Sequence, residues 1–150
     1  MSTLSIATSG LSASSLRLNV AASNIANVLT TGPLPETGGS GASSGGAGSS
    51  SNNSNLPAVY VPLQVNQVDQ SSGSTPGGTV ATVSAVSPGF VPQYDPSASY
   101  ANQDGLVAAP NVDLASEFVQ LLTAKYAFAA NAKVVHTYYD TTKSLLDITA

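Results

Sequence analysis

The first thirty residues carry a hydrophobic repeat with a period of seven. A bulky residue recurs at every seventh position and a smaller residue follows three positions later; the bulky set is Leu4, Leu11, Leu18 and Ile25, and the second set is Ala7, Ser14, Ala21 and Val28. This pattern predicts a helix whose seam lets a second helix approach closely. The run from Thr30 to Pro33 ends it, because glycine suits a helix C-terminus and proline cannot continue a helix. We therefore expect an N-terminal helical segment over 1–31.

The last forty residues predict a second long helix, over 110–150. Apolar or aromatic residues fill eight of ten positions at three- and four-residue spacing, which are Leu114, Phe118, Leu121, Lys125, Phe128, Ala132, Val135, Tyr139, Thr142 and Leu146. Pro110 stops the structure before it, and Asp113 suits the N-cap position. Glu117 follows near the helix N-terminus, where acidic groups are favoured.

The segments between the helices read as a linker and a small β region. Within 32–56, the stretch 38–55 contains only Gly, Ser and Asn apart from Ala42 and Ala47, which is typical of a flexible linker or an insertion. The region 57–109 begins with alternating hydrophobic residues over 58–68, followed by a second β-rich run. These two runs, the second being 79–86, predict an antiparallel hairpin with Pro62 on an edge strand. The four prolines between 87 and 110 predict an extended irregular arm.

Together these elements predict a mainly α protein with a small β region. The two terminal helices form an antiparallel, coiled-coil-like pair, with the hairpin and the arm inserted between them. We expect the leucine seam of the first helix to pack against the Phe118, Leu121, Phe128 and Val135 face of the second. The candidate subunit-packing residues are Leu4, Leu11, Leu18, Ile25, Leu114, Phe118, Leu121, Phe128, Val135 and Leu146.

The composition points to a protein that buries surface against other chains. Charged residues make up 8% of the 150 residues, against roughly 25% in a typical soluble protein. So little charge protects a monomer poorly against association. Residues 30–112 contain no Lys or Arg, which argues against nucleic-acid binding. The serine- and threonine-interrupted N-terminus lacks the features of a cleaved secretory signal, and no stretch reaches the about 20 apolar residues of a membrane-spanning helix, so direct membrane insertion is not expected.

Residues with catalytic or metal-binding potential are sparse. The chain has no Cys and a single histidine, His136, with Asp140 four residues later. Such a pair on a helix is more often a surface hydrogen bond than a catalytic dyad, and no motif surrounds a nucleophilic serine. One histidine and scattered carboxylates do not give metal-ligand spacing. We expect no enzyme activity, no metal and no cofactor.

Both ends of the chain resemble the axial proteins of the bacterial flagellum, in particular the proximal rod proteins of the basal body. The N-terminal resemblance lies in "LRLNVAASNIANVLTTGP", whose core is Asn24, Ile25, Ala26 and Asn27. The C-terminal resemblance lies in "YDPSASYANQDGLVAAPNVDLASEFVQLL", which includes Pro110, Asn111, Val112, Asp113 and Leu114, followed by Ala130 and Asn131. One difference is that Tyr126 and Phe128 precede the Ala-Asn pair where the family usually has an arginine and a tyrosine.

The resemblance implies a structural subunit of the rod. Proteins of this family pass unfolded through the flagellar type III export apparatus without a cleaved signal, and then assemble in the periplasmic space. Their partners are other rod proteins and copies of themselves, in a helical tube that transmits torque and conducts exported subunits. The alternatives are another rod or hook subunit and, from a different class, a secreted amphipathic protein that binds membranes or surfaces. The second alternative is weakened by the shortage of Lys and Arg.

Overall fold

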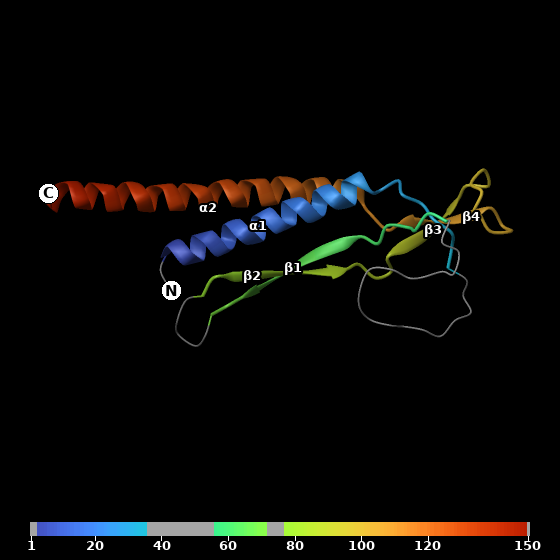
Figure 1. Ribbon diagram of the computed structural model, residues 1–150, viewed down its shortest axis with the longest axis horizontal. Coiled ribbons are helices and arrows are strands. Elements are labelled where there is room, and N and C mark those ends of the chain that lie inside the picture. The colour runs from blue at the N-terminus through green and yellow to red at the C-terminus, as the bar shows by residue number, and fades with distance from the viewer. Residues whose placement is uncertain (1–2, 36–55, 72–76, 150) are drawn as a thin grey trace. The chain divides into compact units, whose positions relative to one another are not determined.

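The computed structural model describes residues 3–35, 56–71 and 77–149, and in these ranges it contains two helices and four strands. In chain order the elements are α1 (Thr3–Ala26), β1 (Leu63–Asp69), β2 (Thr79–Ala85), β3 (Phe90–Tyr94), β4 (Leu106–Pro110) and α2 (Leu114–Thr149) (Figure 1). They fall into two compact units. The helical unit contains α1, β1, β2 and α2, and the β3–β4 unit contains the two remaining strands with 27–35 and 56–62. The Gly/Ser-rich stretch 38–55 lies outside the described residues.

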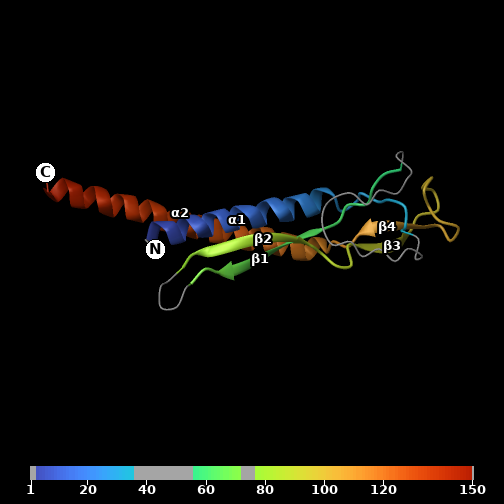
Figure 2. The same cartoon turned by 60° about the horizontal axis from the view of Figure 1, so that its bottom comes forward.

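The helical unit is built on an antiparallel pair of helices, as the sequence predicts. Figures 1 and 2 both show α1 lying along α2 with opposite chain direction. The side chain of Asn24 donates a hydrogen bond to Glu117, and a Cβ added to Gly10 would lie 2.8 Å from the amide nitrogen of Asn131. Gly10 and Asn24 are 14 positions apart on α1, and Glu117 and Asn131 are 14 positions apart on α2. The two contacts therefore belong to one continuous register between the helices.

The β1–β2 hairpin packs along α1 in the same unit. Its antiparallel register pairs Leu63 with Ala85 and Asp69 with Thr79. Near the open end of the hairpin Leu63 bonds to Asn24, and at the other end the backbone N–H of Thr79 donates to Ser9 Oγ at 3.1 Å. A two-stranded hairpin is marginal alone in water, so α1 supplies the surface that it needs.

The expected boundaries of the first strand and the first helix are corrected. The strand begins at Leu63 rather than at residue 58, and buried Pro62 precedes it with its carbonyl bonded to Val86 N at 2.8 Å. The helix ends at Ala26, two residues before the heptad pattern does, because the carbonyl of Asn27 accepts from both the N–H and the hydroxyl of Thr30 in a turn. Hydrophobic spacing alone does not mark these local hydrogen bonds.

The prediction of an irregular arm over 87–110 is wrong, because β3 and β4 form a second antiparallel hairpin. Pro92 lies opposite Ala108, whose N–H and C=O both bond to Gly32 instead of to β3. The Pro92–Ala108 pair is therefore a non-hydrogen-bonded pair of the β3–β4 ladder, and so is the next alternate pair, Phe90 with Pro110. Both prolines occupy positions where the missing N–H costs no ladder bond.

Candidate assembly surface

The buried positions of α1, which face α2 or the β1–β2 hairpin, and the one buried position of α2 among the described residues are occupied mostly by small residues. The buried side chains of the pair are Ala7, Ala13, Ser14, Val20, Ala21 and Asn24 on α1 and Ala124 on α2. We call the alanines and Ser14 of this set the inner seam. Ser14 is satisfied inside its own helix, because its hydroxyl donates to the Gly10 carbonyl at 2.7 Å. Small side chains permit short distances between helix axes, so the two backbones come close together.

The bulky residues of the predicted seam lie beside this contact. The partly exposed members are Leu4, Leu11, Leu18 and Ile25 of α1 with Leu121 and Val135 of α2. The exposed members, all on α2, are Leu114, Phe118, Phe128 and Leu146. The expected packing of the leucine seam against this face leaves both sets incompletely covered within the chain, and Phe118 retains 50% of its exposure. A phenylalanine does not fit between helices that approach closely enough for Gly10 to touch Asn131.

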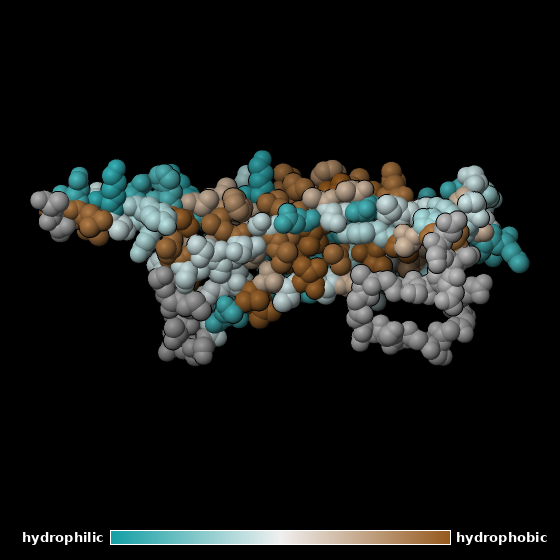
Figure 3. All heavy atoms as spheres, in the orientation of Figure 1, coloured by the Kyte–Doolittle hydropathy of each residue, from teal (hydrophilic) through white to brown (hydrophobic). Residues whose placement is uncertain are grey.

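These bulky residues meet on one side of the helix pair, which we call the outer edge. It consists of Leu4, Leu11, Leu18 and Ile25 with Leu114, Phe118, Leu121 and Phe128. Positions seven apart share one face of α1, and three- and four-residue steps keep the second set on one face of α2. Leu11 and Phe128 join the two sets across an open groove, which is lined by Leu11, Ser12, Ser15, Leu16, Asn19 and Phe128. Figure 3 shows hydrophobic residues gathered along the middle of the helical unit.

Asn24 connects three elements of the helical unit at the other end of α1. Its side chain is fully buried; Nδ2 donates to the Leu63 carbonyl at 2.8 Å and to Glu117 Oε1 at 2.7 Å, while Oδ1 accepts from Leu63 N at 3.0 Å. The side-chain amide thus pairs with the Leu63 backbone as a neighbouring strand would. The role of Asn24 is structural, because its amide joins α1, β1 and α2. The sequence motif indicates that this residue matters, but it gives no partners.

Three further residues of the matching segments, Gly32, Asn111 and Asp113, fix the local backbone after α1 and before α2. In the β3–β4 unit, Gly32 exchanges two backbone hydrogen bonds with Ala108, and an added Cβ would meet Val59 N at 2.6 Å. Only glycine fits this approach. Asn111 fixes the start of β3 by bonding to the carbonyls of Pro88 and Gly89. Asp113 caps α2 as predicted, with Oδ1 accepting from Ala115 N at 3.1 Å.

The other motif positions are distributed between the surface and the helix contact. Ala26 and Ala130 are exposed, and Ile25, Asn27 and Val112 are partly exposed. Asn131 is partly exposed beside Gly10 and donates from Nδ2 to the Ala127 carbonyl at 2.9 Å. This contact explains why a short polar residue stands at 131 within an otherwise apolar stripe.

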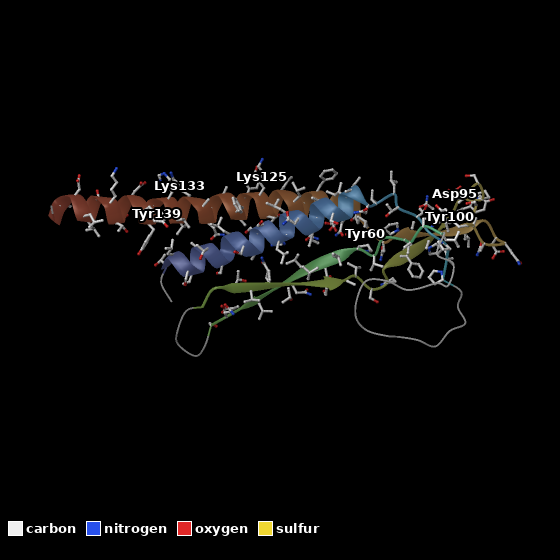
Figure 4. The ribbon with its side chains drawn as sticks, viewed as in Figure 1. Tyr60, Asp95, Tyr100, Lys125, Lys133 and Tyr139 are labelled. Carbon is white, nitrogen blue, oxygen red and sulfur yellow. The ribbon has the colours of Figure 1, made fainter. Side chains whose placement is uncertain are left out.

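The charges in the second half of α2 lie on a face away from α1. The charged residues and the histidine recur at steps of three, four or eight residues and so form one polar stripe along the helix. They are Lys125, Lys133, His136, Asp140, Lys143 and Asp147. Figure 4 shows Lys125 and Lys133 pointing away from α1. His136 Nδ1 lies 2.8 Å from Asp140 Oδ2, with both side chains about two-thirds exposed, so the pair is a surface contact. Among the described residues, no cluster of three metal-ligating side chains occurs and no helix is long and apolar enough to cross a membrane.

Comparison with known proteins places the chain in one class. Residues 4–33 match the family model for flagella basal body rod proteins, and residues 103–148 match the model for the C-terminal region of flagellar basal body rod FlgEFG proteins. The two matches cover α1 and nearly all of α2, with β4, and so contain the inner seam, the outer edge and Asn24.

Curated relatives identify the group within this class. The chain is 30% identical to the flagellar basal-body rod protein FlgC of Borreliella burgdorferi, over 98% of this chain and 95% of that protein. It is 35% identical to FlgC of Salmonella typhimurium, over 88% and 84% of the two chains, and 28% identical to FlgC of Agrobacterium fabrum, over 95% and 90%. The chain belongs to the flagellar basal-body rod protein family, alongside these FlgC relatives. Its role is therefore structural rather than enzymatic, which displaces the alternative of a surface-binding secreted protein.

Proposed function

We propose that the chain is a subunit of the proximal part of the rod, where it packs with copies of itself and with other rod proteins into a helical tube. The tube transmits torque and lets exported subunits pass. The observation that carries this proposal is the outer edge, a row of leucine, isoleucine and phenylalanine, interrupted on α2 by Lys125, that the helix pair leaves partly or largely exposed. Exposed apolar surface of this extent marks an interaction site in a protein with so little charge.

We further propose that the chain reaches the periplasmic space through the flagellar type III export apparatus. Export in an unfolded state requires a unit that opens easily, and the inner seam supports this requirement. Alanine buries little apolar area, and each buried large side chain would add about 1.5–3 kcal/mol that the inner seam largely lacks. The helical unit gains this stabilisation when neighbouring subunits cover the outer edge.

Each part of the chain takes a role in the proposed tube. The terminal segments, 1–31 and 110–150, supply the axial helices, and 57–109 supplies the β region between them in the sequence. Within the segment 32–56, the stretch 38–55 is proposed as an insertion that assembly does not require.

The substitution Leu18→Asp tests the proposed assembly role. Leu18 is partly exposed on the outer edge, so a charge there is solvated in the free chain but buried in the assembled rod, at a cost of several kcal/mol. We expect loss of motility and loss of the protein from purified basal bodies, with export retained. Lys133→Asp places the same charge on the polar stripe and serves as the matched control, with motility retained. Normal motility and normal incorporation of the Leu18 variant would contradict the proposal.

A further inference from the structure

The last turns of α2 extend beyond the start of α1. Continuing the register of Asn24 with Glu117 and Gly10 with Asn131 places Thr3 opposite Tyr138. The following segment, 139–149, therefore has no described residue of α1 opposite it, and we call it the overhang. Figures 1 and 2 show this segment continuing past the first turn of α1.

The overhang continues the face that α2 uses to bind α1. In steps of seven, the fully buried Ala124 is followed by the partly exposed Asn131, then by Tyr138 and Leu145, which are 41% and 60% exposed. The side chains of this row thus become larger toward the C-terminal end of α2, beyond the part that α1 contacts. Tyr138 is the last residue opposite α1, and within the overhang Tyr139, Leu145 and Leu146 are 61%, 60% and 65% exposed. An interface that needs close approach along α1 thus becomes a set of projecting side chains on the overhang.

The charges of the overhang do not interrupt this face. Asp140, Lys143 and Asp147 belong to the polar stripe, on a different side of the helix from Tyr138 and Leu145. Figure 4 shows Tyr139 on the opposite edge of α2 from Lys125 and Lys133. The overhang can therefore bury its apolar face against a partner while its charges stay in water.

The groove on the outer edge has complementary chemistry. Leu11, Leu16 and Phe128 supply the apolar part of its lining, while Ser12, Ser15 and Asn19 supply neutral polar groups. No charged side chain lines it, so an apolar helix face enters without desolvating an ion.

The overhang and the groove of one chain cannot meet each other. The helix register places Ser15 opposite Tyr126, nineteen positions before Leu145, which corresponds to about 30 Å along a straight helix. We infer that the overhang of one copy packs into the groove of a second copy, an inference that rests on the proposed rod function. Two different patches on one molecule make a heterologous contact, which repeats into an open helical assembly when the rotation does not close a ring.

Cysteine cross-linking tests this contact, because the chain contains no cysteine of its own. Purified Leu145→Cys protein is mixed with Ser15→Cys protein and oxidised at increasing concentration. We expect mixed disulfide dimers to exceed dimers of either variant with itself. The double variant, Leu145→Cys with Ser15→Cys, should form a ladder of linked chains rather than an internal disulfide.

The control variant is Lys143→Cys, two residues away on the polar stripe of the same overhang, and it should give few links to Ser15→Cys. The inference is overturned if Leu145→Cys links mainly to itself, if the control links equally well, or if no mixed dimers form at any concentration. Links from Leu145→Cys to a different rod protein, but not to Ser15→Cys, in isolated basal bodies would also overturn it. Incorporation into basal bodies is scored separately, so that failure of this contact and failure of the proposed rod function give different results.

Discussion

The inner seam and the outer edge are two apolar surfaces of the same pair of helices, and they differ in residue size. The inner seam is made of alanines and one serine and is buried within the chain. The outer edge is made of leucine, isoleucine and phenylalanine and remains partly or largely exposed. The chain thus buries its small side chains within the helical unit and leaves its large ones only partly covered by the described part of that unit.

This division separates the requirements of folding from those of assembly. Small residues set a short distance between the helices and a single register, but they bury little apolar area. The large residues provide most of the available hydrophobic free energy, and burial of each contributes about 1.5–3 kcal/mol only when a neighbour covers it. We expect a helical unit built in this way to be held weakly when alone and more strongly once neighbouring subunits cover the outer edge.

The largest effect is expected from overfilling the inner seam with Ala124→Leu. Ala124 is fully buried against α1, so a leucine must push the helices apart, which destabilises the fold by about 1–3 kcal/mol. Chemical denaturation followed by circular dichroism measures the loss in the purified protein. Ala130→Leu, at an exposed position on the same helix, is the control and should leave the denaturation midpoint nearly unchanged. Equal midpoints for the two variants would show that the inner seam is not a close contact.

A smaller loss of stability is expected from Asn24→Ala. The change removes the amide from the Leu63 N–H, the Leu63 carbonyl and the Glu117 carboxylate. Leu63 and Glu117 are partly exposed, so water takes the place of the amide and the net loss is about 1 kcal/mol. Amide hydrogen exchange should show faster exchange at the start of β1. Asn66→Ala removes an exposed hydrogen bond to Ser84 in the same hairpin and provides the comparison. If exchange at Leu63 were equally slow in both variants, the Asn24 junction would not hold the hairpin.

The smallest effect is expected from deleting residues 40–54. This stretch consists of Gly, Ser and Asn with two alanines, so it contains no large apolar side chain. Changes of length in such segments cost little chain entropy. Motility on soft agar should equal that of the unaltered chain, and a loss of motility would mean that a third surface takes part in assembly.

The helical elements were predictable because their signals are periodic and long. The heptad of α1, the three- and four-residue spacing in α2 and the Asp113 cap each indicate a helix without tertiary information. The hairpin of β1 and β2 follows from alternating valines. The hairpin of β3 and β4 was missed because Pro92 and Pro110 argue against strands, and only the bonding of Ala108 to Gly32 shows that their missing N–H groups are not needed.

The large apolar residues of the two helices can be named from the sequence, but how they lie relative to the contact between the helices cannot. From the sequence, large hydrophobic residues are expected in the contact between the helices, because burial of Phe128 or Leu18 contributes more free energy than burial of Ala124. In the structure the small residues are the buried ones, because the helices approach closely where Gly10 meets Asn131. A pattern read along one helix identifies its apolar faces without measuring the distance to the next helix.

The sequence by itself determined the two helices, the antiparallel pairing, the shortage of charge and the family to which the chain belongs. The antiparallel pairing follows because the segment between the helices must bring the chain back, and the other features follow from local periodicity, from composition or from short motifs. Tertiary structure decided which apolar face lies inside, what Asn24 binds and how far α2 extends past α1. These features depend on the register between segments that are distant in the sequence, and register is fixed by packing and by hydrogen bonds across space.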